Sequence, residues 1–182
     1  SSETIDIELL KKKLAEVPDM DGLELASVVS TKEAYEMGDA KSAIRIAVMD
    51  YGVKRNILNC MVERGAFVKV FPAKTTLAEV KKFEPHGYFI SNGPGDPAPM
   101  DYAVNTLKEI LKEEKPVFGI CLGHQLVARA NDIPTFKMHH GHRGLNHPVK
   151  NLVTGRSEIT TQNHGFGVDP EAMKKADHLE IT

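Results

Sequence analysis

The sequence has few cysteines, no excess of one charge and no long hydrophobic run, and each absence excludes a class of protein. Its two cysteines are too few for a disulfide-stapled scaffold and favour a reducing, cytoplasmic setting. The net charge of -2 leaves no basic footprint for nucleic acid. No apolar stretch approaches the roughly 20 residues that cross a bilayer. Neither glycine-rich nucleotide-binding motif is present, so nothing supports a nucleotide-binding module.

The sequence is ordinary for one globular domain, with 182 residues, 41% hydrophobic and 26% charged. Residues 1–42 differ from the rest, because a short amphipathic helix at residues 7–14 is followed by the breakers Pro18 and Gly22. We therefore expect residues 1–42 to form an arm or linker and residues 43–182 to form the domain.

From Ile44 onward, apolar runs that are typical of buried strands alternate with helical periodicity. Strands are expected at residues 44–50, 67–71, 87–91 and 116–120, and helices at residues 54–64, 76–82, 102–112 and from Cys121 through Arg129. This order predicts an α/β fold with a mostly parallel open sheet and helices on both faces. Short β segments at residues 135–139, 146–150 and 158–162 predict an antiparallel extension.

Cys121 follows the fourth strand, and Gly119 and Gly123 flank it in the pattern G-x-C-x-G. This is the thiol form of a nucleophile elbow, in which small neighbours let strand and helix crowd a strained turn. The helix start is expected to lower the thiol pKa, and the N–H of Leu122 could stabilise an oxyanion. Cys60 lies among apolar helix residues and is interpreted as core. Without its glycines, Cys121 would also be interpreted as buried filler.

A second loop with unusual chemistry, Asn92–Pro97, follows the third strand and contains Gly93 and Gly95 between prolines. Ligands of open α/β sheets bind beyond the carboxyl ends of the strands. The loop is therefore either a structural turn or a set of amides that approaches a substrate closely.

These motifs resemble a known family. The segment Gly119–Gln125 resembles the nucleophile motif of class I, triad-type glutamine amidotransferases. Three more segments, Ser91–Pro97, Gly144–Lys150 and Thr161–Phe166, look like the carbamoyl-phosphate synthase small subunits within that family. The resemblance covers about residues 43–182, and the arm before it looks like the interdomain linker of those subunits. It implies a flavodoxin-like fold.

The resemblance implies a glutaminase that supplies ammonia to a large ATP-using synthase subunit, in pyrimidine or arginine biosynthesis. Cys121 would be the nucleophile, and Gly93 and Leu122 would supply oxyanion-hole amides. The glutamine would be contacted by Gly93, Gly95, Leu122, Gln125, Asn163, Gly165 and Phe166. The resemblance implies no cofactor and no metal in this chain, with ATP used by the partner, and no membrane or nucleic-acid partner.

One departure concerns the catalytic base. The family uses a His with an acid two residues later, in a Gly-His-Pro-Glu segment that these 182 residues do not contain. His178 and Glu180 have that spacing but a different context, and the family does not use His124 as base. We therefore expect little activity from this form, in which the His-Glu segment is interpreted as either truncated or disordered. The alternative function is a non-catalytic glutamine-binding or subunit-docking module.

Smaller points remain open. Asp132 stands where a glycine is expected after the helix, and aspartate tolerates the left-handed conformation. A histidine cluster invites a zinc interpretation, although no cysteine or carboxylate lies among its members, His139, His140, His142 and His147. A thiol peptidase would share the elbow but not the segment Asn163–Phe166.

Overall fold

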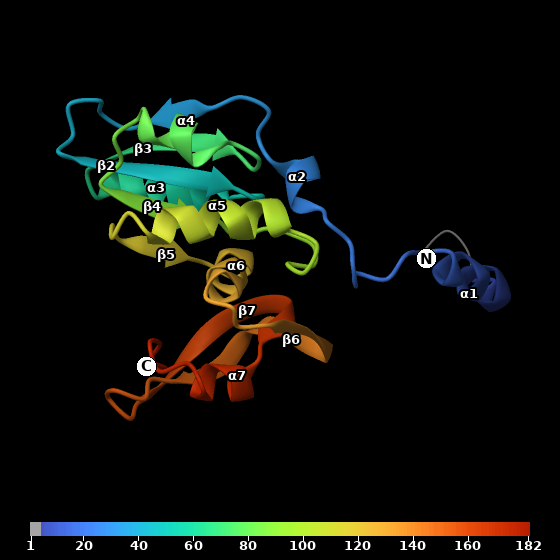
Figure 1. The fold of residues 1–182 in the computed structure, drawn as a ribbon. Coiled ribbons are helices and arrows are strands. Elements are labelled where there is room, and N and C mark those ends of the chain that lie inside the picture. The colour runs from blue at the N-terminus through green and yellow to red at the C-terminus, as the bar shows by residue number, and fades with distance from the viewer. Residues whose placement is uncertain (1–4) are drawn as a thin grey trace.

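The computed structural model describes residues 5–182 and shows a parallel sheet with an attached hairpin (Figure 1). The strands of the main sheet are β1 (Tyr35–Met37), β2 (Ile44–Asp50), β3 (Ala66–Pro72), β4 (Gly87–Ile90) and β5 (Val117–Gly119). The helices around them are α3 (Arg55–Glu63), α4 (Leu77–Lys81), α5 (Asp101–Leu111) and α6 (Leu122–Ala130). Every element predicted between residues 44 and 130 is present, with each end within one residue of its predicted position.

The main sheet has the strand order β1-β3-β2-β4-β5. The pairs β2–β3, β2–β4 and β4–β5 are parallel, and only β1 runs antiparallel to its neighbour β3. In register, Val48 of β2 lies between Val70 of β3 and Phe89 of β4. The predicted mostly parallel sheet is therefore confirmed.

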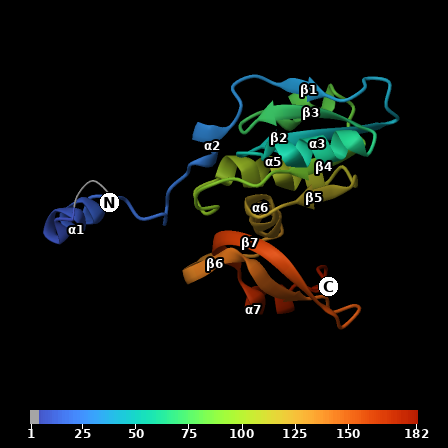
Figure 2. The same ribbon diagram turned by 180° about the vertical axis from the view of Figure 1, so that it is seen from behind.

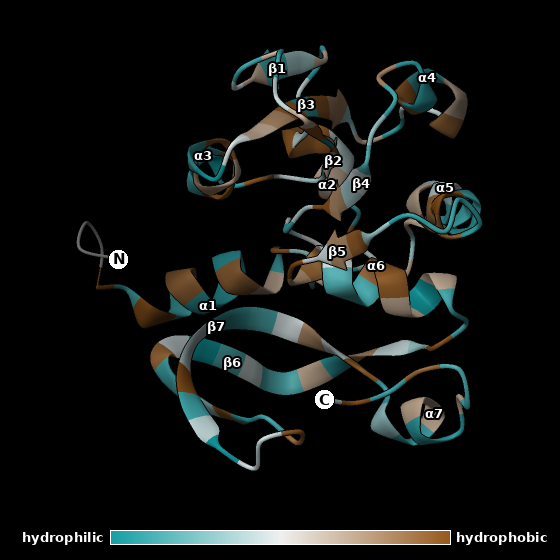
Figure 3. Ribbon diagram, turned by 90° about the vertical axis from the view of Figure 1, so that its left-hand side faces the viewer, coloured by the Kyte–Doolittle hydropathy of each residue, from teal (hydrophilic) through white to brown (hydrophobic). Residues whose placement is uncertain are grey.

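Helices cover both faces of this sheet, as Figure 3 shows, with α3 on one side and α4 and α5 on the other. The larger core cluster joins the α4, α5 and α6 helices to one face and includes Met49, Ile90 and Leu107, which are fully buried. The smaller cluster joins α3 to the other face through Leu58 and Phe89. All four helices are amphipathic, and burial of their apolar faces on the sheet is what stabilises them.

The antiparallel extension is a long hairpin of β6 (Thr135–Lys150) and β7 (Ser157–Val168), followed by α7 (Pro170–Lys174). The antiparallel pairing is confirmed, but the three separate short segments are wrong. The register shifts between Lys137 and His142 and again between Gly144 and His147. Residues 135–150 therefore form one continuous strand with bulges, and Gly141 lies within the first of them.

Residues 5–42 contain two further helices, α1 (Ile7–Ala15) and α2 (Ala26–Val29), besides β1. Helix α1 projects away from the domain in both Figure 1 and Figure 2. In contrast, Ala26 is fully buried, and Glu36 of β1 pairs with Lys69 of β3 at 2.9 Å. The domain boundary between residues 42 and 43 stays a prediction. No helix within residues 5–182 has the length and apolar character that a membrane span requires.

Candidate active site at the carboxyl ends of the strands

Cys121 lies between β5 and α6 with φ 52° and ψ −109°, a backbone conformation that L residues rarely adopt. Its two glycine neighbours explain why the chain can turn there. A Cβ on Gly123 would lie 2.0 Å from the carbonyl oxygen of Ile90, and one on Gly119 would lie 2.6 Å from the carbonyl carbon of Gly123. The predicted strained elbow with obligatory glycines is confirmed.

The loop after β4 lies against this elbow. A Cβ on Gly93 would lie 2.9 Å from the side chain of Leu122 and 1.9 Å from the carbonyl oxygen of Tyr51. Gly93 is thus wedged between the first residue of α6 and the residue after β2. Only glycine lets the backbone of this loop approach the elbow so closely.

The same loop is fastened at both ends by side chains. At its start, the amide of Asn92 donates to the carbonyl of Gly52 at 3.0 Å and accepts from the N–H of Lys54 at 3.3 Å. At its end, Arg129 of α6 donates to the carbonyl oxygens of Pro97 and of Ala98, the latter at 2.7 Å. The loop is therefore held to both the β2–α3 turn and the elbow helix.

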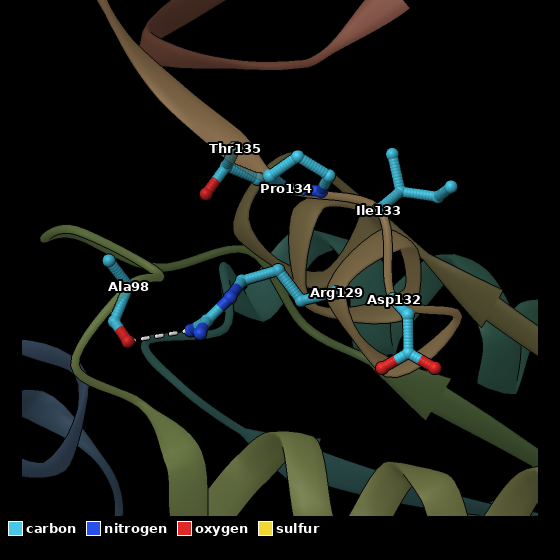
Figure 4. Close-up of a pocket in the computed structure, with 6 residues that line it drawn as sticks. All are labelled: Ala98, Arg129, Asp132, Ile133, Pro134 and Thr135. Atoms are coloured by element: carbon cyan, nitrogen blue, oxygen red, sulfur yellow. Dashed lines mark hydrogen bonds between the residues drawn. The ribbon is translucent and has the colours of Figure 1, made fainter. Parts of the chain in front are cut away.

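A shallow hollow of about 310 Å³ lies beside this Arg129 contact, with Ile133, Pro134 and Thr135 on its other side (Figure 4). Asp132 lines it too, at φ 60°, so the residue after the helix does adopt the expected left-handed conformation. Cys121 does not line this hollow. We assign it no role in the site.

Strand β7 lies beside Cys121 and forms the third side of the site. The sulfur of Cys121 lies 3.9 Å from the carbonyl oxygen of Asn163, and the buried amide of Gln125 donates to the carbonyl of Phe166 at 2.8 Å. The structure therefore brings these four residues together with Gly93 and Leu122. Gly165 lies between Asn163 and Phe166 in β7.

Gly95 differs from the other predicted contact residues, because its nearest neighbours belong to the segment before α2. A Cβ on Gly95 would lie 2.7 Å from the carbonyl oxygen of Leu23 and 2.9 Å from the N atom of Leu25. Cys60 also differs from its prediction, since it is only partly buried on α3 rather than in the core.

The thiol of Cys121 is partly exposed, yet its pKa is not lowered. Burial raises the pKa of the Cys121 thiol, and this effect outweighs the N–H of Leu122 and the ammonium of Lys54, which both lower it. The expectation of a lowered thiol pKa at the helix start is therefore wrong for this structure. Desolvation of the sulfur is stronger than its attraction to the helix N-terminus.

No imidazole within residues 5–182 forms a hydrogen bond with the sulfur of Cys121, which donates to the carbonyl oxygen of Asn163. His124 and His178 are exposed. His164 contacts the carbonyl oxygen of Phe166 at 2.9 Å and the Nδ1 atom of His142 at 3.1 Å. His142 and His164 therefore belong to a hydrogen-bond network along the hairpin rather than to a pair with the thiol.

The predicted alternative of a zinc site finds no support in the described part of the chain, where no three His, Cys, Asp or Glu side chains converge. His139 and His140 pack edge to face at 4.2 Å between ring centroids, and His142 lies 5.2 Å from His147. The four rings thus form one edge-to-face pair and one tilted pair on the hairpin.

Sequence reasoning missed three side chains that hold the site loops. Asp50 accepts from the N–H groups of Thr31, Gly52 and Val53, and it thereby fixes the turn after β2. Arg129 and Asp96 hold the loop Asn92–Pro97, which we name the glycine loop. An aspartate at a strand end and one between prolines are recognisable signals, but their partners lie far away in the sequence.

Comparison with known proteins agrees with this geometry. The family model described as glutamine amidotransferase class-I matches residues 47–182. The carbamoyl phosphate synthase small chain of Pseudomonas putida is 52% identical over 171 residues, which cover 86% of this chain and 45% of that protein. The small chain of Polynucleobacter asymbioticus is 46% identical and covers 92% and 48%. The chain thus spans about half the length of these relatives.

Solved structures share the fold at low sequence identity. A putative GMP synthase protein from Thermoplasma acidophilum has a TM-score of 0.57 at 20% identity and covers 70% of this chain and 67% of that one. A glutamine amidotransferase from Thermotoga maritima has a TM-score of 0.51 at 18% identity and covers 69% and 62%. Because the family model extends from within β2 through the elbow and the hairpin, the chain belongs to the class-I glutamine amidotransferases.

Proposed function

We propose that this chain is the glutamine-hydrolysing part of a carbamoyl-phosphate synthase small subunit, with Cys121 as its nucleophile. The observation that carries the proposal is the strained, partly exposed cysteine, which lies between the glycine loop and β7. Strain of this kind is kept at reactive positions, since it turns the side chain out of the sheet. The names of the relatives support the assignment to this synthase.

In the proposed reaction, the thiolate of Cys121 attacks the side-chain amide carbon of glutamine. The N–H groups of Leu122 and Gly93 stabilise the oxyanion that forms. The carbon–nitrogen bond then breaks, and the nitrogen takes a proton and leaves as ammonia. Water attacks the resulting thioester, which releases glutamate and restores the thiol.

We propose that Gly93, Gly95, Leu122, Gln125, Asn163, Gly165 and Phe166 contact the glutamine. Most of these residues offer main-chain amides or carbonyls, which suit a small zwitterion with many hydrogen-bonding atoms. One N–H of the Gln125 amide already donates to Phe166, so its carbonyl oxygen and its second N–H are the groups left for the substrate. Ammonia would pass to a large subunit that uses ATP, and no cofactor is needed in this chain.

We further propose that residues 5–182 alone turn glutamine over slowly. The leaving nitrogen needs a proton, and no imidazole in this part of the chain forms a hydrogen bond with the sulfur. The high thiol pKa has the same consequence, since it keeps the thiolate fraction small at neutral pH.

The test is covalent labelling with a glutamine analogue that carries a diazoketone in place of the amide, read by mass spectrometry. We expect labelling at Cys121 that glutamine slows and asparagine does not. Cys121→Ser should abolish it, and the matched variant Cys60→Ser should leave it unchanged. Modification of Cys60 first would overturn the site assignment.

The alternative function, a module that only binds glutamine or docks on a partner, predicts a different result. Such a module would bind glutamine in calorimetry while its Cys121 reacted with the analogue no faster than with iodoacetamide. Glutamate release by the 182-residue chain, at a rate comparable to that of the small chain from Pseudomonas putida, would refute the slow turnover.

A further inference from the structure

Asp96 is a buried carboxylate in the glycine loop that the proposed reaction does not use, at 3% exposure. One of its oxygens accepts from the N–H of Ala98 at 2.8 Å, inside the loop. The other accepts from the N–H of Gly22 at 2.9 Å, 74 residues earlier in the chain. The N–H of Asp96 in turn donates to the carbonyl of Leu23 at 2.8 Å. Asp96 therefore joins the loop to the linker through two hydrogen bonds.

Residues 22–27, which we name the linker strap, also pack tightly on the loop. Gly95 has φ +99°, and a Cβ there would overlap the backbone of the strap at Leu23 and Leu25. The contact is backbone against backbone, without a flexible side chain that could take up a shift. Any displacement of the strap must therefore move the glycine loop or break these contacts.

The strap has an anchor of its own on the domain. Glu24 accepts from the N–H of Ser27 at 2.8 Å, from the hydroxyl of Ser27, and from the hydroxyl of Tyr102 on α5 at 3.0 Å. The ammonium of Lys74 lies 5.4 Å from the centre of the Tyr102 ring. Ala26 then enters the core with no exposed surface. The strap is thus fixed at its end next to α2, while its other end continues to the projecting helix α1 (Figure 1).

We propose that Asp96 is a positioning residue through which the linker strap sets the position of the glycine loop, so that glutamine binding depends on the linker. This inference rests on the proposed function, because the loop carries the proposed contacts Gly93 and Gly95. The strap lies before residue 47, where the match to the family model begins. The linker is thereby a working part of the substrate site.

Asp96→Asn isolates the contact with the strap. The amide oxygen can keep the N–H of Ala98, but the NH2 group then meets the N–H of Gly22, so that two donors oppose each other. The matched control is Asp39→Asn. Asp39 is exposed and accepts from the N–H of Lys41 at 2.9 Å, a turn of the same kind that touches neither loop nor strap. Both variants remove one negative charge.

The readout is the rate constant of Cys121 labelling by the diazoketone analogue of glutamine, divided by that for iodoacetamide. A loss of one buried hydrogen bond predicts a fall of about tenfold in this ratio for Asp96→Asn. The analogue concentration that gives half of the maximal labelling rate should rise, whereas the maximal labelling rate itself should stay the same. Asp39→Asn should match the parent chain.

Tyr102→Phe provides a second test that leaves the loop untouched. It removes the hydroxyl that donates to Glu24, and we expect a smaller fall in the same ratio, with the labelling by iodoacetamide unchanged. If Asp96→Asn does not fold, Tyr102→Phe alone tests the proposed coupling between the linker strap and the glycine loop. If both variants fold and keep the parent ratio, the proposed coupling is wrong. If the parent chain itself shows no preference for the glutamine analogue, the proposed function is what fails.

Discussion

The strain at Cys121 can be measured by comparing alanine and glycine at this position. Both substitutions remove the sulfur, and they differ only in the Cβ atom. The backbone there, φ 52° and ψ −109°, is the mirror image of the extended region, which glycine adopts about as readily as the ordinary one. Alanine keeps the clash of its Cβ with the backbone. We therefore expect Cys121→Gly to be more stable than Cys121→Ala.

The size of the difference follows from two opposing effects. A non-glycine residue in such a conformation costs about 1–3 kcal/mol. Glycine loses more conformational entropy on folding, which costs about 0.5–1 kcal/mol. The glycine variant should then be favoured by up to roughly 2.5 kcal/mol. For a chain of this length, that is a rise of up to roughly 10 °C in the midpoint of thermal unfolding.

The matched control is the other cysteine. Cys60 lies inside α3, where glycine should be less stable than alanine by about 1 kcal/mol. Urea unfolding followed by circular dichroism would measure all four variants. The sign of the glycine–alanine difference should reverse between positions 60 and 121. A glycine variant at position 121 that is less stable than its alanine partner, as at position 60, would refute the argument for strain.

Three further outcomes are expected. Gly123→Ala places a Cβ 2.0 Å from the carbonyl oxygen of Ile90, so it should destabilise the chain by about 1–3 kcal/mol in urea and slow Cys121 labelling. Because burial raises the thiol pKa, labelling by iodoacetamide should still rise with pH above the ordinary thiol value of about 8.5, and Lys54→Gln should move the midpoint higher. Gln125→Leu removes the donor to Phe166, so the rate of backbone amide hydrogen exchange should rise more in β7 than in β2, relative to the parent chain.

The central sheet was predictable because its signals are local. A strand such as residues 44–50 has β-branched residues at alternate positions, and the helix after it repeats apolar residues at a helical period. Each element could thus be recognised within a short window. The elbow at Cys121 was predictable for the same reason, since both glycines that permit its conformation lie within two residues.

The hairpin and the segment before β2 were less predictable because non-local contacts determine them. The bulges at Lys137 and Gly144 exist only as a mismatch with β7, some 20 residues later. Strand β1 is three residues long and gains its pairing from β3. The hydrogen bonds of Asp96 reach back to Gly22 and Leu23. Nothing within a short window of sequence indicates such partners.

Helix α6 organises the whole site through residues four apart. Cys121 stands at its start, Gln125 holds β7 one turn later, and Arg129 holds the glycine loop one turn after that. Residues at this spacing lie along one face of a helix. One rigid helix therefore positions the sulfur, the hairpin and the loop, and its neighbouring residues Leu122 and Leu126 fix it in the core. A small rotation of α6 would displace all three together, whereas loss of Gln125 or Arg129 would release only one.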